Sequence, residues 1–493
     1  MVIPANKSLT VNNTITTSGI DSLIYIVSSS TIANGSLIFH NASDAPVHAT
    51  VEMYSKAFYD EAGPTNQKYH WQYFGIPVSQ VTASPTFDNS YVRVWDEKGD
   101  AITNHWLSLT NSSILTPFTG YEITQKVATT IVFQGQLVNS DFDSGQLSVT
   151  PTALFPGQHV YANPYTAAID IRQLTFGLQT EASVYLYNTG TFDQWTQASG
   201  ANAPGTSAGQ YVAIPKNTAG SSGLPRQIPS MQALLVKAMT NSSDATFGIT
   251  YNTVVMNNTD PQRSPGINYQ PGTDNVSTMI DVKGASYSDK MWLFTQPGCT
   301  PNFDNGWDGA KMPGIALTPQ IFAVGNDGNY QVNAVDDINN TLLGFQAGQD
   351  VEYTMTFTHQ NLKSKYEAVF LVDLVENKAV DITESGSTYS FVAESTPTSV
   401  NRFKIATRNI EKDATDKNTL LKVFSSGNTV FVQNLGGLNG EMNIYDMMGR
   451  YIRRANFGPY GVTAIQAGSI PGAYVVNAAT TGERVSKRII LGK

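Results

Sequence analysis

Cysteine and charged residues are scarce in this chain of 493 residues. Cys299 is the single cysteine, which excludes an intramolecular disulfide, so the fold must rely on hydrophobic burial or bound ions. Only 14% of the residues are charged, and the formal net charge is −9. Nucleic-acid binding needs a basic surface that neutralises phosphates, so this charge balance argues against a nucleic-acid partner.

Long apolar runs are also missing. An early apolar run is LIYIV, Leu23 to Val27, far shorter than the roughly 20 residues that a membrane-spanning helix needs. Met1 is followed by VIPANKSLTVNN rather than by a basic and then apolar stretch, so no secretory signal peptide is recognisable. We therefore expect no transmembrane segment in the chain.

The residues that are abundant favour strands and turns. The chain has 40 glycines, 23 tyrosines and long stretches rich in Thr, Ser and Asn. At this length it can bury several cores, and domain-size priors predict three or four domains. We predict an all-β protein built from tandem β-sandwich or jelly-roll-like modules.

The segment 420–493 has a distinct character. Short β-prone runs alternate there with glycine-bearing turns, as in a compact sandwich. It holds eight Lys or Arg and three Asp or Glu, hence +5, which leaves −14 for residues 1–419. Its three motifs are NIYDMMGR (443–450), PGAYVV (471–476) and SKRIILGK (486–493).

These three ordered motifs at the C-terminus resemble the C-terminal sorting domain of type IX secretion cargo in Bacteroidetes. The resemblance implies an Ig-like sandwich that directs export, with the secretion machinery and a cell-surface sortase as partners. It also implies an extracellular or outer-membrane location, and a signal peptide upstream of Met1. An ordinary terminal Ig-like domain is the alternative. The motif residues carried over are Asp446, Gly449, Arg450, Gly472, Tyr474, Lys487 and Arg488.

The rest of the chain divides into four further segments and a linker. Residues 1–52 alternate apolar and polar positions in short bursts and are similar to the last coils of a β-solenoid, with an ordinary sheet edge as the alternative. Segments 53–150 and 151–262 read as two diverged copies of one aromatic β-module, similar to modules of Bacteroidetes adhesin-like proteins. Segment 263–410 predicts a jelly-roll-like sandwich, and 411–419 a charged linker open to a sortase.

The copies share the order of their strands. WQYFGIP, YVRVWDE, LTPFTGYEI and TIVFQGQL in the first correspond to HVYANPY, SVYLYNTG, IPSMQALLV and TFGITY in the second. The second copy carries a Gly/Ala/Pro/Ser-rich insertion, 198–226, which we predict to be an exposed loop.

Catalytic patterns are weak. The six histidines show no zinc-ligand spacing, and the GTSAG string around Ser207 lacks the strand and helix that a nucleophile elbow requires. We therefore predict that the chain is not an enzyme.

Two binding sites are candidates. Asp304, Asn305 and Asp308, around Gly306, place oxygens where a calcium ion could bind, with Asp289 as a further ligand; the alternative is that they hydrogen-bond the turn. Trp195, in TFDQWTQ, is the candidate for stacking on a glycan, because the other tryptophans of the modules lie in strands where core packing is expected.

The leading hypothesis is a non-catalytic, adhesin-like or structural surface protein with a glycan or a host or bacterial surface as ligand. Two alternatives stay open: a carbohydrate-binding or glycan-degrading surface protein, and the C-terminal part of an enzyme whose catalytic domain lies upstream.

Overall fold

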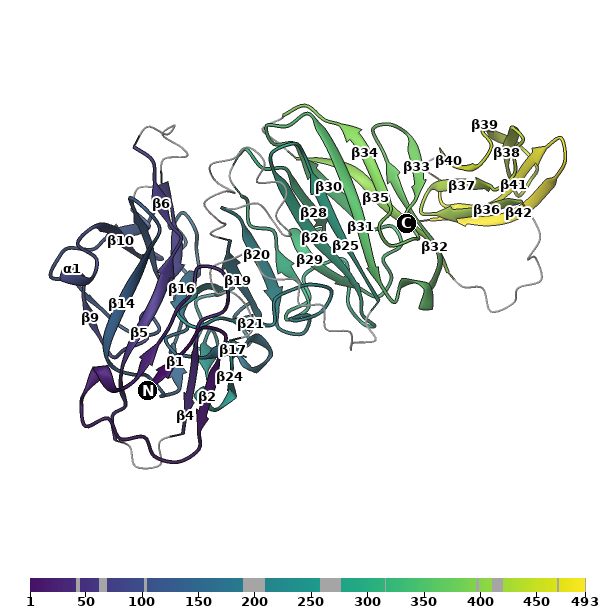
Figure 1. The fold of residues 1–493 in the computed structure, drawn as a ribbon. Coiled ribbons are helices and arrows are strands. Elements are labelled where there is room, and N and C mark those ends of the chain that lie inside the picture. The colour runs from purple at the N-terminus through teal and green to yellow at the C-terminus, as the bar shows by residue number, and fades with distance from the viewer. Residues whose placement is uncertain are drawn as a thin grey trace. The chain divides into compact units, whose positions relative to one another are not determined.

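The computed structural model describes residues 1–40, 45–61, 69–101, 104–188, 209–257, 276–314, 316–395, 399–409, 420–467 and 470–492. Nearly all its regular structure is strand, which confirms the predicted all-β class (Figure 1). The chain forms two compact units. The first comprises Met1–Thr273, Ala285–Asp289 and Asp304–Thr318, and the second comprises Asp274–Gly284, Lys290–Phe303 and Pro319–Lys493.

Parallel strand pairs open the first unit. β1 (Val2–Ile3), β3 (Tyr25–Ile26) and β5 (His48–Ser55) pair in parallel in one sheet, and β2 (Ser8–Val11) pairs in parallel with β4 (Ser36–Phe39) in another. Successive strands thus alternate between the two sheets, and each sheet grows by parallel pairing. This is the arrangement of a β-solenoid. β2 and β4 run side by side below β5 in Figure 1.

Module 1 follows directly, because β5 also pairs antiparallel with β14. Its second sheet has the order β11-β10-β13-β8. The two sheets enclose a core that includes Val51, Phe74, Ile123 and Phe133. Its elements are β6 (Phe58–Tyr59), β7 (Tyr69–His70), β8 (Gln72–Phe74), β9 (Val81–Thr82), α1 (Ala83–Thr86), β10 (Ser90–Trp95), β11 (Trp106–Ser108), β12 (Ile114–Leu115), β13 (Tyr121–Gln125) and β14 (Thr129–Gln136).

Module 2 repeats this topology. Its main sheet has the order β20-β19-β22-β16, which matches β11-β10-β13-β8 strand for strand, and the small pairs β9–β12 and β17–β21 also correspond. The duplication predicted from strand order is therefore present in the fold. The strands are β15 (Phe142–Asp143), β16 (Gln158–Ala162), β17 (Ala168–Asp170), β18 (Thr175–Phe176), β19 (Ser183–Tyr187), β20 (Tyr211–Pro215), β21 (Gln227–Ile228), β22 (Ala233–Lys237), β23 (Phe247–Ile249) and β24 (Val254–Val255).

The prediction of an exposed loop over 198–226 is wrong for the described residues 209–226. β20 pairs with β19 along its whole length, and Val212, Ala213 and Ile214 are buried. Ala219 and Leu224 are buried as well. Small residues let the backbone of this segment approach the neighbouring strands closely. A composition rich in Gly, Ala and Ser is therefore compatible with burial and does not by itself indicate an exposed loop.

The second unit contains the predicted sandwich. Its strands form one path, β34-β31-β25-β26-β29-β28-β30-β35-β32-β33, and strands from both ends of that path contribute to a single core. The strands are β25 (Val276–Lys283), β26 (Ser288–Thr295), β28 (Gln320–Val324), β29 (Asn329–Val335), β30 (Leu342–Gln346), β31 (Glu352–Gln360), β32 (Tyr366–Asp373), β33 (Lys378–Asp381), β34 (Thr388–Val392) and β35 (Val400–Asn409).

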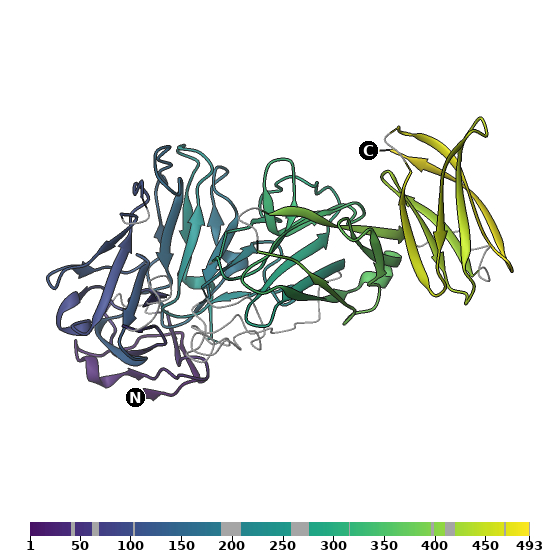
Figure 2. The ribbon, with the colours of Figure 1, turned by 90° about the horizontal axis from the view of Figure 1, so that it is seen from above.

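The C-terminal module is a seven-stranded sandwich, coloured yellow in Figure 2. Sheets β40-β37-β36 and β39-β38-β41-β42 enclose a core of Val430, Ile444, Val476 and neighbouring apolar residues. The number of strands and their two-sheet packing agree with an Ig-like fold. The strands are β36 (Leu421–Ser426), β37 (Thr429–Asn434), β38 (Gly440–Asp446), β39 (Tyr451–Phe457), β40 (Gly461–Gln466), β41 (Gly472–Thr480) and β42 (Arg484–Leu491).

Candidate functional site: an aromatic surface beside a buried carboxyl

The first of the three C-terminal motifs forms a tight turn between β38 and β39. Asp446 Oδ1 accepts hydrogen bonds from the backbone N–H groups of Met448 and Arg450, both at 2.9 Å, and Asp446 Oδ2 lies 2.6 Å from Arg450 Nε. The hydrogen bond from the Arg450 backbone lowers the pKa of Asp446. Gly449 has a φ of +75°, which favours glycine. The structure thus brings Asp446, Gly449 and Arg450 together.

The residues of the other two motifs lie on β41 and β42. Gly472 begins β41, and the hydroxyl of the buried Tyr474 donates to the Ile470 carbonyl at 2.8 Å. Lys487 and Arg488 are exposed on β42. These two strands pair with each other over the length of the motif, with Tyr474 opposite Ile489.

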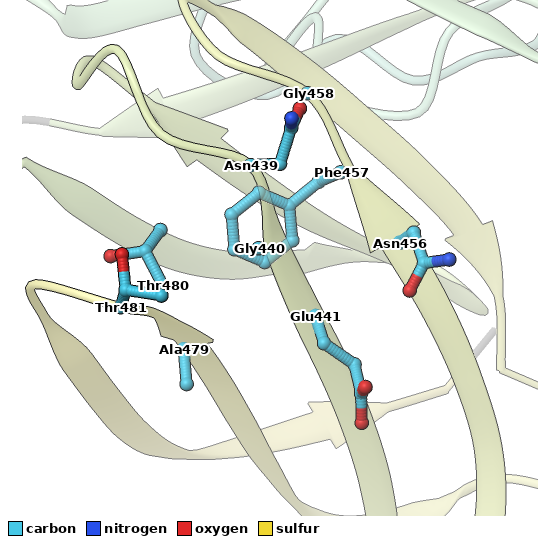
Figure 3. A pocket seen from close by; sticks show the side chains of 9 residues that line it. All are labelled: Asn439, Gly440, Glu441, Asn456, Phe457, Gly458, Ala479, Thr480 and Thr481. Atoms are coloured by element: carbon cyan, nitrogen blue, oxygen red, sulfur yellow. The ribbon is translucent and has the colours of Figure 1, made fainter.

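An open depression lies at one end of the C-terminal module, with a volume of about 550 Å³ (Figure 3). Its rim carries the polar side chains of Asn439, Asn456 and Thr480. Phe457 lies against Gly440, its cross-strand partner, so the ring covers the backbone where a side chain is missing. The ring therefore has a structural role at this site.

The candidate calcium residues are hydrogen-bonded within the first unit. Asn305 Oδ1 accepts from the Ala182 N–H at 2.6 Å, and its amide donates to the Thr180 carbonyl at 3.0 Å. Asp308 Oδ2 accepts from the Asp304 N–H at 2.7 Å. The described residues hold no group of three or more His, Cys, Asp or Glu side chains arranged for a metal ion. These contacts agree with the hydrogen-bonding alternative, and calcium binding stays a prediction.

Asp289 has a different partner from the one proposed. Both of its carboxylate oxygens contact Lys311 Nζ, at 2.7 and 2.6 Å. Asp289 and Lys311 are both buried, and burial lowers the pKa of Lys311. The Asp289 carboxylate opposes this effect of burial, because it favours the charged form of Lys311.

Trp195 and Ser207 lie outside the described residues. The other module tryptophans divide by environment: Trp106 is buried, Trp95 is half-buried and donates to the Gln158 carbonyl at 2.6 Å, and Trp71 is half-buried beside exposed tyrosines. Core packing thus accounts for Trp106 but not for Trp71.

We call Tyr59, Tyr69, Trp71 and Tyr91 the aromatic surface. The hairpin β6–β7 carries Tyr59 directly opposite Tyr69, with 6.0 Å between ring centroids. Tyr91, on β10, lies 5.5 Å from Tyr59 and 6.0 Å from Tyr69, and Trp71 lies 6.0 Å from Tyr69. Tyr91 is 54% exposed and Tyr69 43%. Four rings thus form one continuous patch, carried by the β6–β7 pair, by Trp71 and by β10; β6 and β10 are labelled in Figure 1.

An arginine connects this surface to the interior. The Arg93 guanidinium lies 3.9 Å from the Trp71 ring centroid, a cation–π contact, and also contacts the Glu122 carboxylate. Strand register brings Arg93, Glu122 and Tyr73 together. Arg93 on β10 is opposite Glu122 on β13, and Glu122 is in turn opposite Tyr73 on β8. Burial raises the pKa of Glu122 to about 8, against the opposing effect of Arg93.

One buried tyrosine, Tyr73, and two half-buried ones, Tyr187 and Tyr211, complete the inner side of the site. Tyr73 of module 1 stacks on Tyr187 of module 2 with centroids 4.5 Å apart, and its hydroxyl lies 2.8 Å from that of Tyr211. Burial raises the pKa of all three hydroxyls. The hydroxyls therefore remain protonated at neutral pH and link the two main sheets.

Two buried polar atoms of this face lack hydrogen-bond partners within the described part of the chain: Nε of Arg93 and Oγ1 of Thr124. Thr124 is opposite Tyr91 in the sheet. A buried polar atom left without a partner costs about 1–3 kcal/mol. Such atoms are uncommon in folded proteins, and their place beneath exposed rings marks this face as a candidate binding site.

The spacing of residues along two strands indicates part of this site. Alternate residues of a strand share a face, so Trp71 with Tyr73, and Tyr91 with Arg93, were already paired by spacing. Glu122 required knowledge of which strands are neighbours and in what register.

The chain is similar to the minor fimbrium subunit Mfa5 of Porphyromonas gingivalis, with 32% identity over 99% of its own length. It spans 41% of that relative. No family model matches. Comparison with solved structures found a biofilm-associated protein BSP domain at 10% identity, covering 97% of this chain and 99% of the domain, but a TM-score of 0.16 supports no inference about the fold.

Proposed function

We propose that this chain is part of a non-catalytic, adhesin-like or structural protein of the bacterial surface. The similarity to a fimbrium subunit along 99% of the chain carries this proposal. A succession of β-sandwich modules suits such a role, because hydrophobic cores hold the modules together and no disulfide is needed. In the described residues no helix is long and apolar enough to cross a membrane.

A non-catalytic role also fits the way buried carboxylates of the first unit are used. Glu97 accepts hydrogen bonds from Ser148, Thr150 and Gly157 at 2.7–2.9 Å. Glu181 contacts Lys237 at 2.6 Å and accepts from the Tyr185 hydroxyl at 2.7 Å. These groups are engaged in joining strands, which supports a structural use.

The finer proposal is export by type IX secretion, directed by residues 420–493. It is supported by the seven-stranded sandwich, by the Asp446–Arg450 turn, and by the exposed Lys487 and Arg488 on the terminal strand. The secretion machinery and a sortase are the partners that this proposal entails.

The test is surface delivery in a type IX-competent host. The chain is expressed behind a signal peptide that the host recognises, with and without residues 420–493, and surface-exposed protein is quantified by labelling of intact cells. We expect loss of surface delivery on deletion, with the truncated protein retained inside. Equal delivery of both forms would overturn the export proposal while leaving the adhesin proposal to be judged by attachment of the cells to surfaces.

A further inference from the structure

We propose that the aromatic surface of module 1, with Arg93 at its base, is a carbohydrate-binding site. This rests on the proposed adhesin role and names the ligand class of that role. The site differs from the one predicted at Trp195, because it uses residues of the β6–β7 hairpin and of β10.

Ring geometry is the first support. A sugar ring presents C–H groups on one face, and these pack on the faces of Trp and Tyr, while the Tyr hydroxyls at the ring edges hydrogen-bond sugar hydroxyls. Tyr69 and Tyr91 expose about half of their surfaces and lie 6.0 Å apart, at right angles to each other. Together with Tyr59 and Trp71 they offer both ring faces and ring edges to one ligand.

The polar groups beneath the rings are the second support. Arg93 is 28% exposed at its side chain and is held in place by the Trp71 ring and by Glu122, so its planar fork is oriented without a ligand. Its Nε and the Thr124 hydroxyl lack hydrogen-bond partners within the described ranges. Hydroxyl groups of a sugar, directly or through a water molecule, match these groups because a hydroxyl both donates and accepts.

Rigidity is the third support. The rings contact one another, and the inner row of the same face is fixed by the Tyr73–Tyr187 stack and the Tyr73–Tyr211 hydroxyl contact. A site that is ordered before binding loses less conformational entropy when the ligand arrives. A shallow, pre-ordered site of this kind suits a surface glycan present in many copies, for which multivalency raises weak single-site affinity.

Binding of the purified 493-residue chain to an array of immobilised oligosaccharides and proline-rich peptides tests the proposal. Proline-rich peptides are included because they also dock on aromatic surfaces. We expect binding to a subset of the oligosaccharides. Binding to peptides alone, or to nothing on the array, would overturn the proposal.

Matched variants then locate the site. Tyr91→Ala should weaken glycan binding at least fivefold, whereas Tyr451→Ala, a tyrosine of nearly equal exposure (57%) on β39, should leave it unchanged. Arg93→Lys keeps a positive charge opposite Glu122 but loses the planar fork and Nε, and should weaken binding at least threefold. Circular dichroism and melting temperature verify folding of each variant. Equal affinity of Tyr91→Ala and wild-type protein overturns the proposal.

Failure of the carbohydrate site and failure of the proposed adhesin role give different results. A Tyr91→Ala chain that reaches the surface and still attaches cells, with glycan binding unchanged, removes the carbohydrate site and leaves the adhesin role standing. A wild-type chain that binds glycans in solution but is never delivered to the surface contradicts the proposed function instead.

Discussion

Gly75 and Ala162 meet face to face where modules 1 and 2 contact each other: a Cβ placed on Gly75 would lie 2.2 Å from the Ala162 Cβ. The two residues occupy equivalent positions, before Ile76-Pro77 in one copy and Asn163-Pro164 in the other. Their hydrogen bonds are equivalent too. Gly75 N–H donates to the Met231 carbonyl at 3.0 Å, and Ala162 N–H donates to the Phe118 carbonyl at 2.8 Å.

The residues that accept these bonds also correspond. Phe118 and Met231 have positive φ values of 64° and 61°, which is uncommon for residues with side chains. Phe118 lies shortly before β13 in module 1, and Met231 lies shortly before β22 in module 2. The two modules therefore contact each other about an approximate two-fold axis that passes between Gly75 and Ala162, and only one of the two positions can carry a methyl group.

Exchanging the two residues tests this relationship. Gly75→Ala alone overpacks the contact and should lower the free energy of unfolding by about 1–3 kcal/mol. Ala162→Gly alone should lower it by about 1 kcal/mol through backbone entropy and lost packing. The double variant Gly75→Ala, Ala162→Gly should regain most of the loss, as measured by denaturant unfolding. Additive losses in the double variant would show that the axis does not pass here.

Sequence order was enough to predict the duplication but not its geometry. WQYFGIP and HVYANPY could be matched as proline-ended aromatic strands from their letters alone. The contact between Gly75 and Ala162 could not, because it depends on how two folded modules pack. β20 was missed because its YVAIP run is flanked by small and polar residues that suggested a loop, and its burial requires the neighbouring strand β19.

In the candidate sites, too, contacts between sequence neighbours were predictable and contacts between separate strands were not. The turn of Asp446, Gly449 and Arg450 was predictable because its residues are neighbours in sequence. Arg93, Glu122 and Tyr73 come from three strands, and they meet only through strand register. Asp289 was considered only as a calcium ligand, and its partner Lys311, 22 residues away, could not be chosen from spacing.

The Asp289–Lys311 pair predicts a non-additive mutant cycle. Lys311→Met leaves the Asp289 carboxylate buried without its cation and should cost about 3–5 kcal/mol of stability. Adding Asp289→Asn removes the uncompensated charge, so the double variant should be more stable than Lys311→Met alone. Thermal unfolding of the wild-type, single and double variants measures this. A double variant less stable than either single variant would contradict a charge-based role for the pair.

The raised pKa of Glu122 predicts that the stability of the folded chain depends on pH. Its pKa is raised from 4.5 to about 8 in the folded chain, so the folded state binds the proton more tightly than the unfolded state. Stability contributed by this group therefore falls as the pH rises from about 4.5 to about 8. Glu122→Gln cannot titrate, so its melting temperature should decline less than that of the wild type over this range.

Glu97 is the matched control for that experiment. Burial alone would raise its pKa, but hydrogen bonds from Gly157, Thr150 and Ser148 outweigh this and lower it. Stability from Glu97 is therefore lost as the pH falls, and Glu97→Gln should change the acid side of the profile rather than the side above neutral pH. Parallel profiles for wild-type and Glu122→Gln proteins would argue that the Arg93 contact keeps Glu122 ionised.

Metal removal distinguishes the two interpretations of the Asp304–Asp308 turn. If Asn305 and Asp308 act as hydrogen-bonding groups, as their contacts with Ala182 and Asp304 indicate, EDTA should leave the melting temperature unchanged. Asn305→Ala should then cost about 1–3 kcal/mol in either buffer, because two hydrogen bonds are lost. A calcium-dependent rise in melting temperature that Asn305→Ala abolishes would instead establish the ion site.

The C-terminal module makes contacts with the preceding sandwich that should survive a cut between them. Phe424 stacks on Phe370 at 5.2 Å and on Phe431 at 5.0 Å, inside an apolar cluster shared by both parts of the second unit. Around it, Glu367 contacts Arg408 at 2.8 Å and Lys422 at 3.1 Å. Aromatic burial of this kind contributes more than exposed ion pairs do, so Phe424 should dominate the association.

A specific protease site placed within residues 410–419 tests this. After complete cleavage, the two fragments should elute together in size-exclusion chromatography, and Phe424→Ala should let them separate, whereas Tyr460→Ala, an exposed aromatic of the same module, should not. Separation of the wild-type fragments would show that the shared cluster is too weak to hold them. Co-elution would mean that a cut in this segment, such as the proposed sortase would make, does not by itself free the body of the protein, because the C-terminal module must also be separated from Phe370.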